Sequence, residues 1–229
     1  MEQTAEERRE AYCAAMGEEL GSVFSKLWDE VVRLHIYWEQ FVELFGGTPG
    51  RIEIANRTAP RFFVLVQRLL WNEALISISR LTAPLKTRGK ENLTVRLLPQ
   101  LIQDPELRSE VEDVVINLIE TADFANKWRN RHLAHRDLLL ALDQPTEPLP
   151  TATRGAIEEC LAGLADVMNA VELPYMNGTT AYSHSVSSGD ARELLYWLRD
   201  GLRRDEDRRA AMEVGEYDAR LFNDDLGAV

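Results

Sequence analysis

Apolar residues recur every three or four positions along much of the chain, which is the spacing of one face of a helix. Between residues 6 and 45 this face comprises Leu20, Phe24, Leu27, Val31, Leu34, Trp38, Phe41 and Phe45. The period predicts one long amphipathic helix over these residues. The glycine- and proline-rich stretch 46–50 ends it, and a loop is expected to continue to Pro60, a residue suited to the first turn of the next helix.

Residues 60–81 are apolar almost all round, and a helix without a polar face is buried on most sides. We therefore predict that this segment is the central helix, with Glu73 and Arg80 pointing out through a gap in the bundle. Leu69→Ala should then cost about 2–5 kcal/mol, as for buried leucines generally. The core is expected to include Trp28, Trp38, Phe62, Val66, Leu69, Val115 and Leu118.

Further helices follow from capping signals and periodicity. After a loop at 83–91, a short helix should end near Gln103. Asp104 and Pro105 have the features of an N-cap and a first helical position, and they predict a long helix that runs toward Asp137. Two more helices are expected over 153–172 and 190–212, with a long loop over 174–189 between them.

No alternating strand pattern and no internal repeat is visible in the sequence. The predicted fold class is therefore all-α, an up-and-down helical bundle of four to five main helices plus a C-terminal helix. We expect residues 1–175 to form the bundle. Residues 176–229 are expected to form a loop and a C-terminal helical extension packed on the same domain.

Composition restricts the possible partners. The 229 residues carry a formal net charge of -12, so the protein as a whole repels polyanions, and nucleic-acid binding would need a local basic patch. The start of the chain has no apolar signal region and no run approaches 18 apolar residues, so we expect a cytoplasmic protein without a membrane span. Cys13 and Cys160 form no C-x-x-C pair, which leaves zinc chemistry unsupported.

The most concentrated chemistry lies in residues 128–137, at the end of the predicted long helix. Three arginines, two histidines and an asparagine fall within these ten residues. Arg129 follows Val111 by 18 residues and therefore continues the apolar face. His135 would lie roughly 120° and 9 Å from Arg129 on a straight helix. Either the helix breaks near Asn130 or a second copy of the chain supplies the missing group, and the second alternative favours a homodimer.

These residue types suit cleavage of RNA without a metal ion. A neutral histidine can take the proton of a ribose 2′-hydroxyl, and an arginine can hold the phosphate and stabilise its developing charge. Two alternatives remain open. His132, His135 and Asp137 have a ligand-like helical spacing for a metal ion, and the whole stretch could be a polar helix end that caps carbonyl groups.

The motif itself resembles a known family. Residues 129–135, with arginine, asparagine and then histidine after five intervening positions, resemble the signature of HEPN domains. Residues 71–74, 79–84 and 89–93 also look like the abortive-infection U branch of that superfamily. The resemblance covers about residues 10–170.

The resemblance implies a four- or five-helix bundle that dimerises with its motifs facing each other. It also implies metal-independent endoribonuclease activity, often in phage defence or toxin systems, with no cofactor. Arg129 and His135 would be the catalytic pair and Asn130 a supporting polar residue. RNA would be the substrate, and an antitoxin or nucleotidyltransferase could be a partner, although no tyrosine closely follows His135 as a target for the latter. The competing hypothesis is a non-catalytic helical interaction module, since some HEPN proteins are not enzymes.

Overall fold

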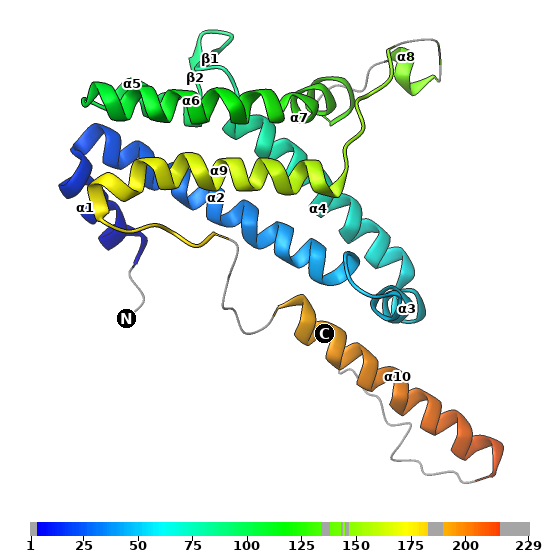
Figure 1. Ribbon diagram of the computed structural model, residues 1–229. Coiled ribbons are helices and arrows are strands. Elements are labelled where there is room, and N and C mark those ends of the chain that lie inside the picture. Colours follow the sequence, from blue (N-terminus) through cyan, green and yellow to red (C-terminus); the bar gives the residue numbers. More distant parts are fainter. Residues whose placement is uncertain (1–3, 134–137, 143, 145–146, 183–189, 216–229) are drawn as a thin grey trace. The chain divides into compact units, whose positions relative to one another are not determined.

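The computed structural model describes residues 4–133, 138–142, 144, 147–182 and 190–215, and it confirms the all-α class (Figure 1). Its elements are α1 (Ala5–Met16), α2 (Glu18–Phe45), α3 (Pro49–Thr58), α4 (Pro60–Leu81), β1 (Lys86–Thr87), β2 (Lys90–Glu91), η1 (Val95–Leu97), α5 (Leu98–Leu101), α6 (Pro105–Thr121), α7 (Asp123–Trp128), η2 (Arg129–Leu133), α8 (Leu138–Ala141), α9 (Arg154–Met176) and α10 (Ala191–Glu213). The described strands, β1 and β2, have two residues each and pair as a single antiparallel hairpin.

The chain divides into two compact units. The first comprises residues 1–39 and 68–185, and the second comprises residues 40–67 and 186–229. The boundary near residue 175 that the sequence suggests stays a prediction.

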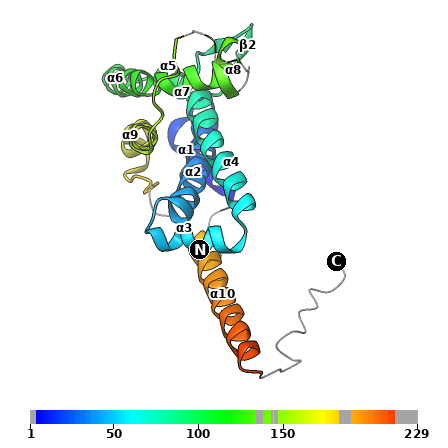
Figure 2. The ribbon, with the colours of Figure 1, turned by 90° about the vertical axis from the view of Figure 1, so that its right-hand side faces the viewer.

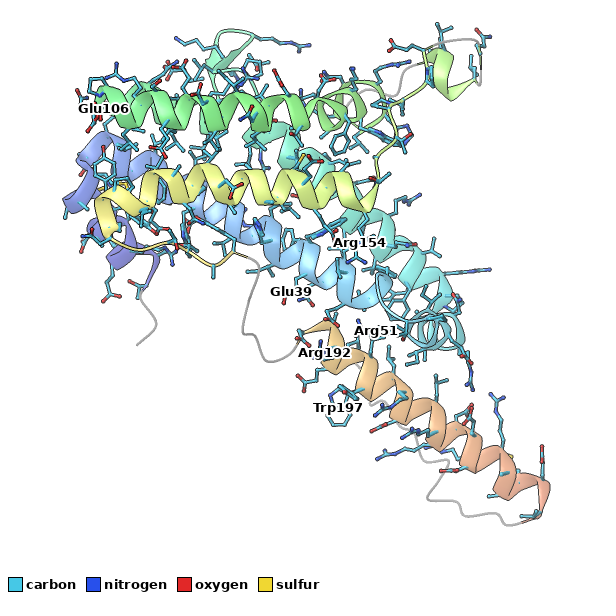
Figure 3. The ribbon with its side chains drawn as sticks, viewed as in Figure 1. Glu39, Arg51, Glu106, Arg154, Arg192 and Trp197 are labelled. Atoms are coloured by element: carbon cyan, nitrogen blue, oxygen red, sulfur yellow. The ribbon has the colours of Figure 1, made fainter. Side chains whose placement is uncertain are left out.

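In the first unit, α6 and α9 lie side by side, as both ribbon views show (Figures 1 and 2). The side-chain view marks Glu106 in the first turn of α6 and Arg154 in the first turn of α9, at opposite ends of this pair (Figure 3). The two helices are therefore antiparallel, as in an up-and-down bundle.

The single helix predicted over residues 6–45 is wrong at its start. Gly17 ends α1 with a φ of +87°, a conformation that favours glycine, and α2 begins at the next residue. Gly21 permits the close approach of the two helices, because a Cβ atom there would lie 2.5 Å from the backbone of Cys13. Helical periodicity continues through both helices and so does not reveal the turn between them.

The core of the first unit joins α2, the end of α4, α6 and α9. Its largest fully buried side chains include Phe24, Leu27, Leu34, Leu75, Ile78, Leu81, Ile157, Leu164 and Met168. Among the residues expected in the core, Trp38, Val115 and Leu118 are buried, which confirms those predictions.

The prediction that the whole of α4 is a buried central helix is wrong. Phe62 and Leu69 are each 56% exposed, and Val66 is half-buried, as is Trp28 of α2. Apart from Phe63, which belongs to the second unit and is 5% exposed, the buried residues of α4 begin at Ala74 and continue to Leu81, where α4 joins the bundle core. The cost of 2–5 kcal/mol expected for Leu69→Ala is therefore too large, because little of that side chain leaves water on folding.

Helix α4 also has the length and hydropathy of a helix that could cross a membrane. A core helix of a soluble protein meets the same two criteria. The absence of a membrane span therefore stays a prediction.

The second unit contains α3, which lies within the segment expected to be a loop. Pro49 starts α3 at its first turn, and the helix packs against α10. Glu43, at the end of α2, accepts hydrogen bonds from Arg51 at 2.8 Å and from Arg192 at 3.1 Å (Figure 3). Trp197 projects from α10 and is 69% exposed, which leaves a large aromatic surface in water.

Candidate functional site

The long helix expected from Asp104 to Asp137 starts as predicted but does not continue unbroken. The side chain of Asp104 accepts hydrogen bonds from the backbone N–H groups of residues 106 and 107, as an N-cap does. The helix is interrupted at Ala122, continues as α7, and changes to a π-helical turn at Arg129. Such single turns bond residue i to i+5 and are frequent at functional sites.

The π-helical turn η2 alters the expected geometry of the motif. The angle and distance calculated between Arg129 and His135 assumed 3.6 residues per turn, and that assumption does not hold for residues 129–133. The alternative that the helix breaks near Asn130 stays a prediction, because residues 129–133 remain helical, as a π-helical turn. His135 lies outside the described residues, as do Arg136 and Asp137.

The start of the motif is fixed to the bundle by contacts on both sides of α7. Asn126 accepts a hydrogen bond of 2.7 Å from the hydroxyl of Ser79, a residue of α4 that is only 2% exposed. The indole N–H of Trp128 donates to the carbonyl of Pro150 at 2.8 Å, and its ring meets that of His132 edge to face. These contacts position α7 while Arg129 and Asn130, which follow it, remain exposed.

Arg129 and Asn130 lie on the wall of a cleft of about 1050 Å³. Its other walls come from α2, the end of α4, the β1–β2 hairpin and η1, all within the first unit. The Arg129 guanidinium donates to Asn130 Oδ1 at 3.1 Å, so the two motif residues are in direct contact. The polar lining residues are Glu30, Ser79, Arg80, Thr87, Arg88, Glu91, Asn92, Arg96, Asn126, Arg129 and Asn130.

The cleft has a positive formal charge, because four arginines and two glutamates line it. Arg80 pairs with Glu30, which also accepts from Arg33. Arg96 donates through Nε to the carbonyl of Thr82 at 3.0 Å. Among the residues that the structure describes, no carboxylate pairs with the other three arginines of the cleft, Arg88, Arg96 and Arg129. Their charges therefore remain available to an anionic ligand.

Sequence reasoning identified only part of this cationic surface. It asked for a local basic patch, and the basic residues of the loop at 83–91 and of the motif region are Lys86, Arg88, Lys90, Lys127, Arg129, Arg131 and Arg136. Of these, only Arg88 and Arg129 line the cleft in the described structure. Asp123 pairs with Lys127 at 2.7 Å and raises the pKa of that lysine.

Arg80 and Arg96 were missed as cleft residues. Arg80 does point outward, as expected, but it points into this cleft. Arg96 lies outside every motif, and only the path of the chain after α4 brings it to the cleft.

The described part of the chain contains no cluster of three or more histidine, cysteine or acidic side chains that could hold a metal ion. The metal alternative depends on His135 and Asp137, which are not described, so it stays open. Burial raises the pKa of the Cys160 thiol to about 12, which disfavours the nucleophilic thiolate.

The sequence was compared with known families and proteins. No curated protein and no solved structure matches the chain. Residues 17–194 match AbiU2, a family of HEPN domains. The match runs beyond residue 170, where the resemblance was expected to end, and reaches the first turn of α10. Because the match covers most of its length, the chain belongs to the AbiU2 family of HEPN proteins.

Proposed function

We propose that the protein is a metal-independent endoribonuclease that acts as a homodimer in the cytoplasm, in phage defence or a toxin system. The observation that carries this proposal is the location of Arg129 and Asn130 on an arginine-lined cleft. Unpaired guanidinium groups are suited to bind phosphate, and Arg is the side chain best matched to that geometry. An acidic protein that keeps such a cleft has a local attraction for a polyanion.

The reaction would use the ribose 2′-hydroxyl as the nucleophile. His135, as the base, takes the proton of that hydroxyl, and the oxygen attacks the adjacent phosphorus. The bond from phosphorus to the 5′-oxygen breaks, and a second group, acting as the acid, gives a proton to this leaving oxygen. The products are a 2′,3′-cyclic phosphate and a 5′-hydroxyl. Arg129 stabilises the charge on the phosphate oxygens in the transition state, and Asn130 orients Arg129.

Two catalytic protons need two groups, which supports a composite dimeric site. Among the described residues that line the cleft there is no histidine. One copy of the motif offers His135 as the base, and His135 of the partner subunit would be the acid. Dimerisation is common among HEPN domains and is proposed here on that basis. In a toxin system, an antitoxin or a nucleotidyltransferase would be the further partner.

Cleavage of a labelled single-stranded RNA in the presence of EDTA tests the proposal. The wild type should leave 2′,3′-cyclic phosphate ends and should not cut DNA, which lacks the 2′-hydroxyl. Arg129→Ala and His135→Ala should each lower the rate on the order of 100-fold or more. Lys127→Ala is the matched control, because Lys127 is a nearby cation paired with Asp123 outside the cleft. Equal losses in Lys127→Ala and Arg129→Ala would contradict the assignment.

The composite site has its own test. Light scattering at micromolar concentration should give the mass of a dimer. An equal mixture of wild type and His135→Ala, after subunit exchange, should be less active than the wild-type chains that it contains, because each mixed dimer lacks one of the two catalytic histidines. A strict monomer that cleaves RNA would remove the composite site and keep the ribonuclease.

The second candidate function is a non-catalytic interaction module. It is favoured by exposed apolar side chains on α4 and α10, including Phe62 and Trp197. Exposed aromatic surface is typical of protein interfaces. If the pure wild type cleaves no RNA, this candidate replaces the first.

A further inference from the structure

The β1–β2 hairpin presents an arginine to the cleft from a strained position. The pairing of Lys86 with Glu91 and of Thr87 with Lys90 leaves Arg88 and Gly89 as the two turn residues. Their φ values are +50° and +80°, the pattern of a type I′ turn, which prefers asparagine, aspartate or glycine at both positions. An arginine in the left-handed region costs about 1 kcal/mol or more. Such backbone strain is often found where the side chain has a role in binding or catalysis.

The hairpin is held at its base, so the tip has a defined place. The side chain of Asn92 donates to the carbonyl of Pro84 at 2.6 Å and to the hydroxyl of Thr87 at 2.7 Å. Its backbone N–H donates to the carbonyl of Leu85 at 2.9 Å. A cross-strand ion pair between Lys86 and Glu91 adds a further link. Arg88 therefore extends from an anchored turn.

Arg96 lines the same cleft from η1, the 3-10 turn that follows this hairpin. The buried hydroxyl of Thr94 accepts from the backbone N–H of Arg96 and donates to the carbonyl of Leu81 at 2.8 Å. The bond from Arg96 Nε to Thr82 fixes the guanidinium further. Arg88, Arg96 and Arg129 thus come from a hairpin, a 3-10 turn and a π-helical turn, and each contributes an arginine without a described carboxylate partner.

The size of the cleft limits the ligand. Small-molecule pockets measure about 300–1,000 Å³, and this cleft, at about 1050 Å³, lies just above that range. A ligand that uses three separate cations needs several negative charges, and a short stretch of a single nucleic-acid strand supplies one at each linkage.

We propose that Arg88 and Arg96 form a second phosphate subsite, distinct from Arg129, that holds single-stranded RNA on one side of the cleaved linkage. This rests on the proposed function, in which Arg129 binds the phosphate that reacts. The hairpin binds and orients the strand and takes no part in the proton transfers.

Binding of a strand that cannot be cleaved tests this subsite without relying on activity. The probe is a fluorescently labelled 2′-O-methyl RNA of about eight nucleotides, and its anisotropy is followed with the full-length protein at several salt concentrations. Arg88→Asn and Arg96→Gln should each weaken binding roughly tenfold at low salt. Each should also reduce the slope of log affinity against log salt by about 0.7, the value for one phosphate contact on a single strand.

The hairpin offers matched controls. Asparagine tolerates the left-handed conformation, so Arg88→Asn removes the charge and retains the turn. Arg88→Lys keeps the charge and should retain most of the affinity. Lys90→Gln removes a charge from the same hairpin at an exposed residue outside the described cleft lining, and it should leave affinity and salt slope nearly unchanged.

The outcomes separate this inference from the proposed function. Wild-type affinity in Arg88→Asn, or an equal loss in Lys90→Gln, would overturn the subsite even if the protein cleaves RNA. A wild type that binds the probe with the expected dependence on Arg88 and Arg96 but never cleaves RNA would refute the ribonuclease and leave the subsite standing. A blunt RNA duplex that binds as tightly, with the same dependence on Arg88, would overturn the preference for a single strand.

Discussion

Two polar sites of the first unit differ in how their groups are satisfied. In the Glu172 cluster (Tyr12, Trp28, Asn169, Glu172 and Thr180), the 6%-exposed carboxylate of Glu172 accepts from Tyr12 at 2.7 Å and from Thr180 at 2.8 Å. The Trp28 indole donates to Thr180, whose backbone N–H donates to Asn169. In the Arg129 cleft, Arg88, Arg96 and Arg129 have no such carboxylate partner among the described residues.

The difference separates a structural role from a binding role. Buried polar groups must find partners within the protein, because an unsatisfied one costs about 1–3 kcal/mol. The Glu172 cluster meets that requirement and joins α1, α2 and α9 to the chain that follows α9. The exposed side chains of Arg88 and Arg129 keep their water until a ligand replaces it, so their place in the cleft adds little to stability, whereas the half-buried Arg96 also donates to the carbonyl of Thr82.

The largest effect on stability is expected in the Glu172 cluster. Glu172→Ala would leave the hydroxyls of Tyr12 and Thr180 without their acceptor and open a cavity, at a cost of about 3–5 kcal/mol. Urea unfolding followed by circular dichroism measures this loss. Glu159→Ala, an exposed acid on the same helix, should stay within about 0.5 kcal/mol of the wild type. A loss below 1 kcal/mol in Glu172→Ala would mean that the cluster does not hold these elements together.

Removing one donor from the cluster should have a smaller effect. Tyr12→Phe keeps the ring that packs edge to face on Phe24 and deletes the hydroxyl that donates to Glu172. We expect a cost of about 1.5–3 kcal/mol, the value of a hydrogen bond to a charged group. The loss of unfolding free energy in the double variant should be smaller than the sum of the losses in Tyr12→Phe and Glu172→Ala, since both changes remove the same bond. Full additivity would show that the two groups act independently.

Acidification should lower the free energy of unfolding through the half-buried side chain of His35. This ring lies against Tyr182, and burial lowers its pKa below the usual 6.5, so the folded protein favours the neutral form. The unfolded chain takes up a proton first, and the free energy of unfolding should therefore fall as the pH drops below about 6.5. Carboxylates contribute as well, so the measurement compares wild type with His35→Asn at pH 7.5 and pH 5.5. The same pH dependence in both would exclude His35 as the cause.

The smallest effect on stability is expected in the cleft. Arg129→Ala removes an exposed side chain that donates to its neighbour Asn130 and pairs with no carboxylate among the described residues, so the free energy of unfolding should change by less than about 0.5 kcal/mol. The same variant should lose most of its ribonuclease activity. Thermal unfolding and cleavage assays on one preparation check both. A strongly destabilised Arg129→Ala would show that this arginine has a structural role, as the Glu172 cluster does, and would contradict the difference between the two sites.

The sequence by itself determined most of the local structure. Asp104 and Pro105 start α6, Pro60 starts α4, and the apolar periods of α2, α6 and α9 predict which faces are buried. These features act within a few residues through capping bonds and the helical repeat, so they can be read without the fold. The family motif likewise placed Arg129 and Asn130 at a candidate site before their surroundings were known.

Only the tertiary structure decided which apolar faces find a partner and which cations meet. Leu69 and Leu75 lie on one helix and look alike in sequence, yet Leu69 is 56% exposed and Leu75 is fully buried, because only the end of α4 enters the core. The path of the chain after α4 brings Arg88 and Arg96 to the same cleft as Arg129, although more than thirty residues of sequence separate them from it. Burial and clustering depend on contacts between distant segments, and no local pattern carries that information.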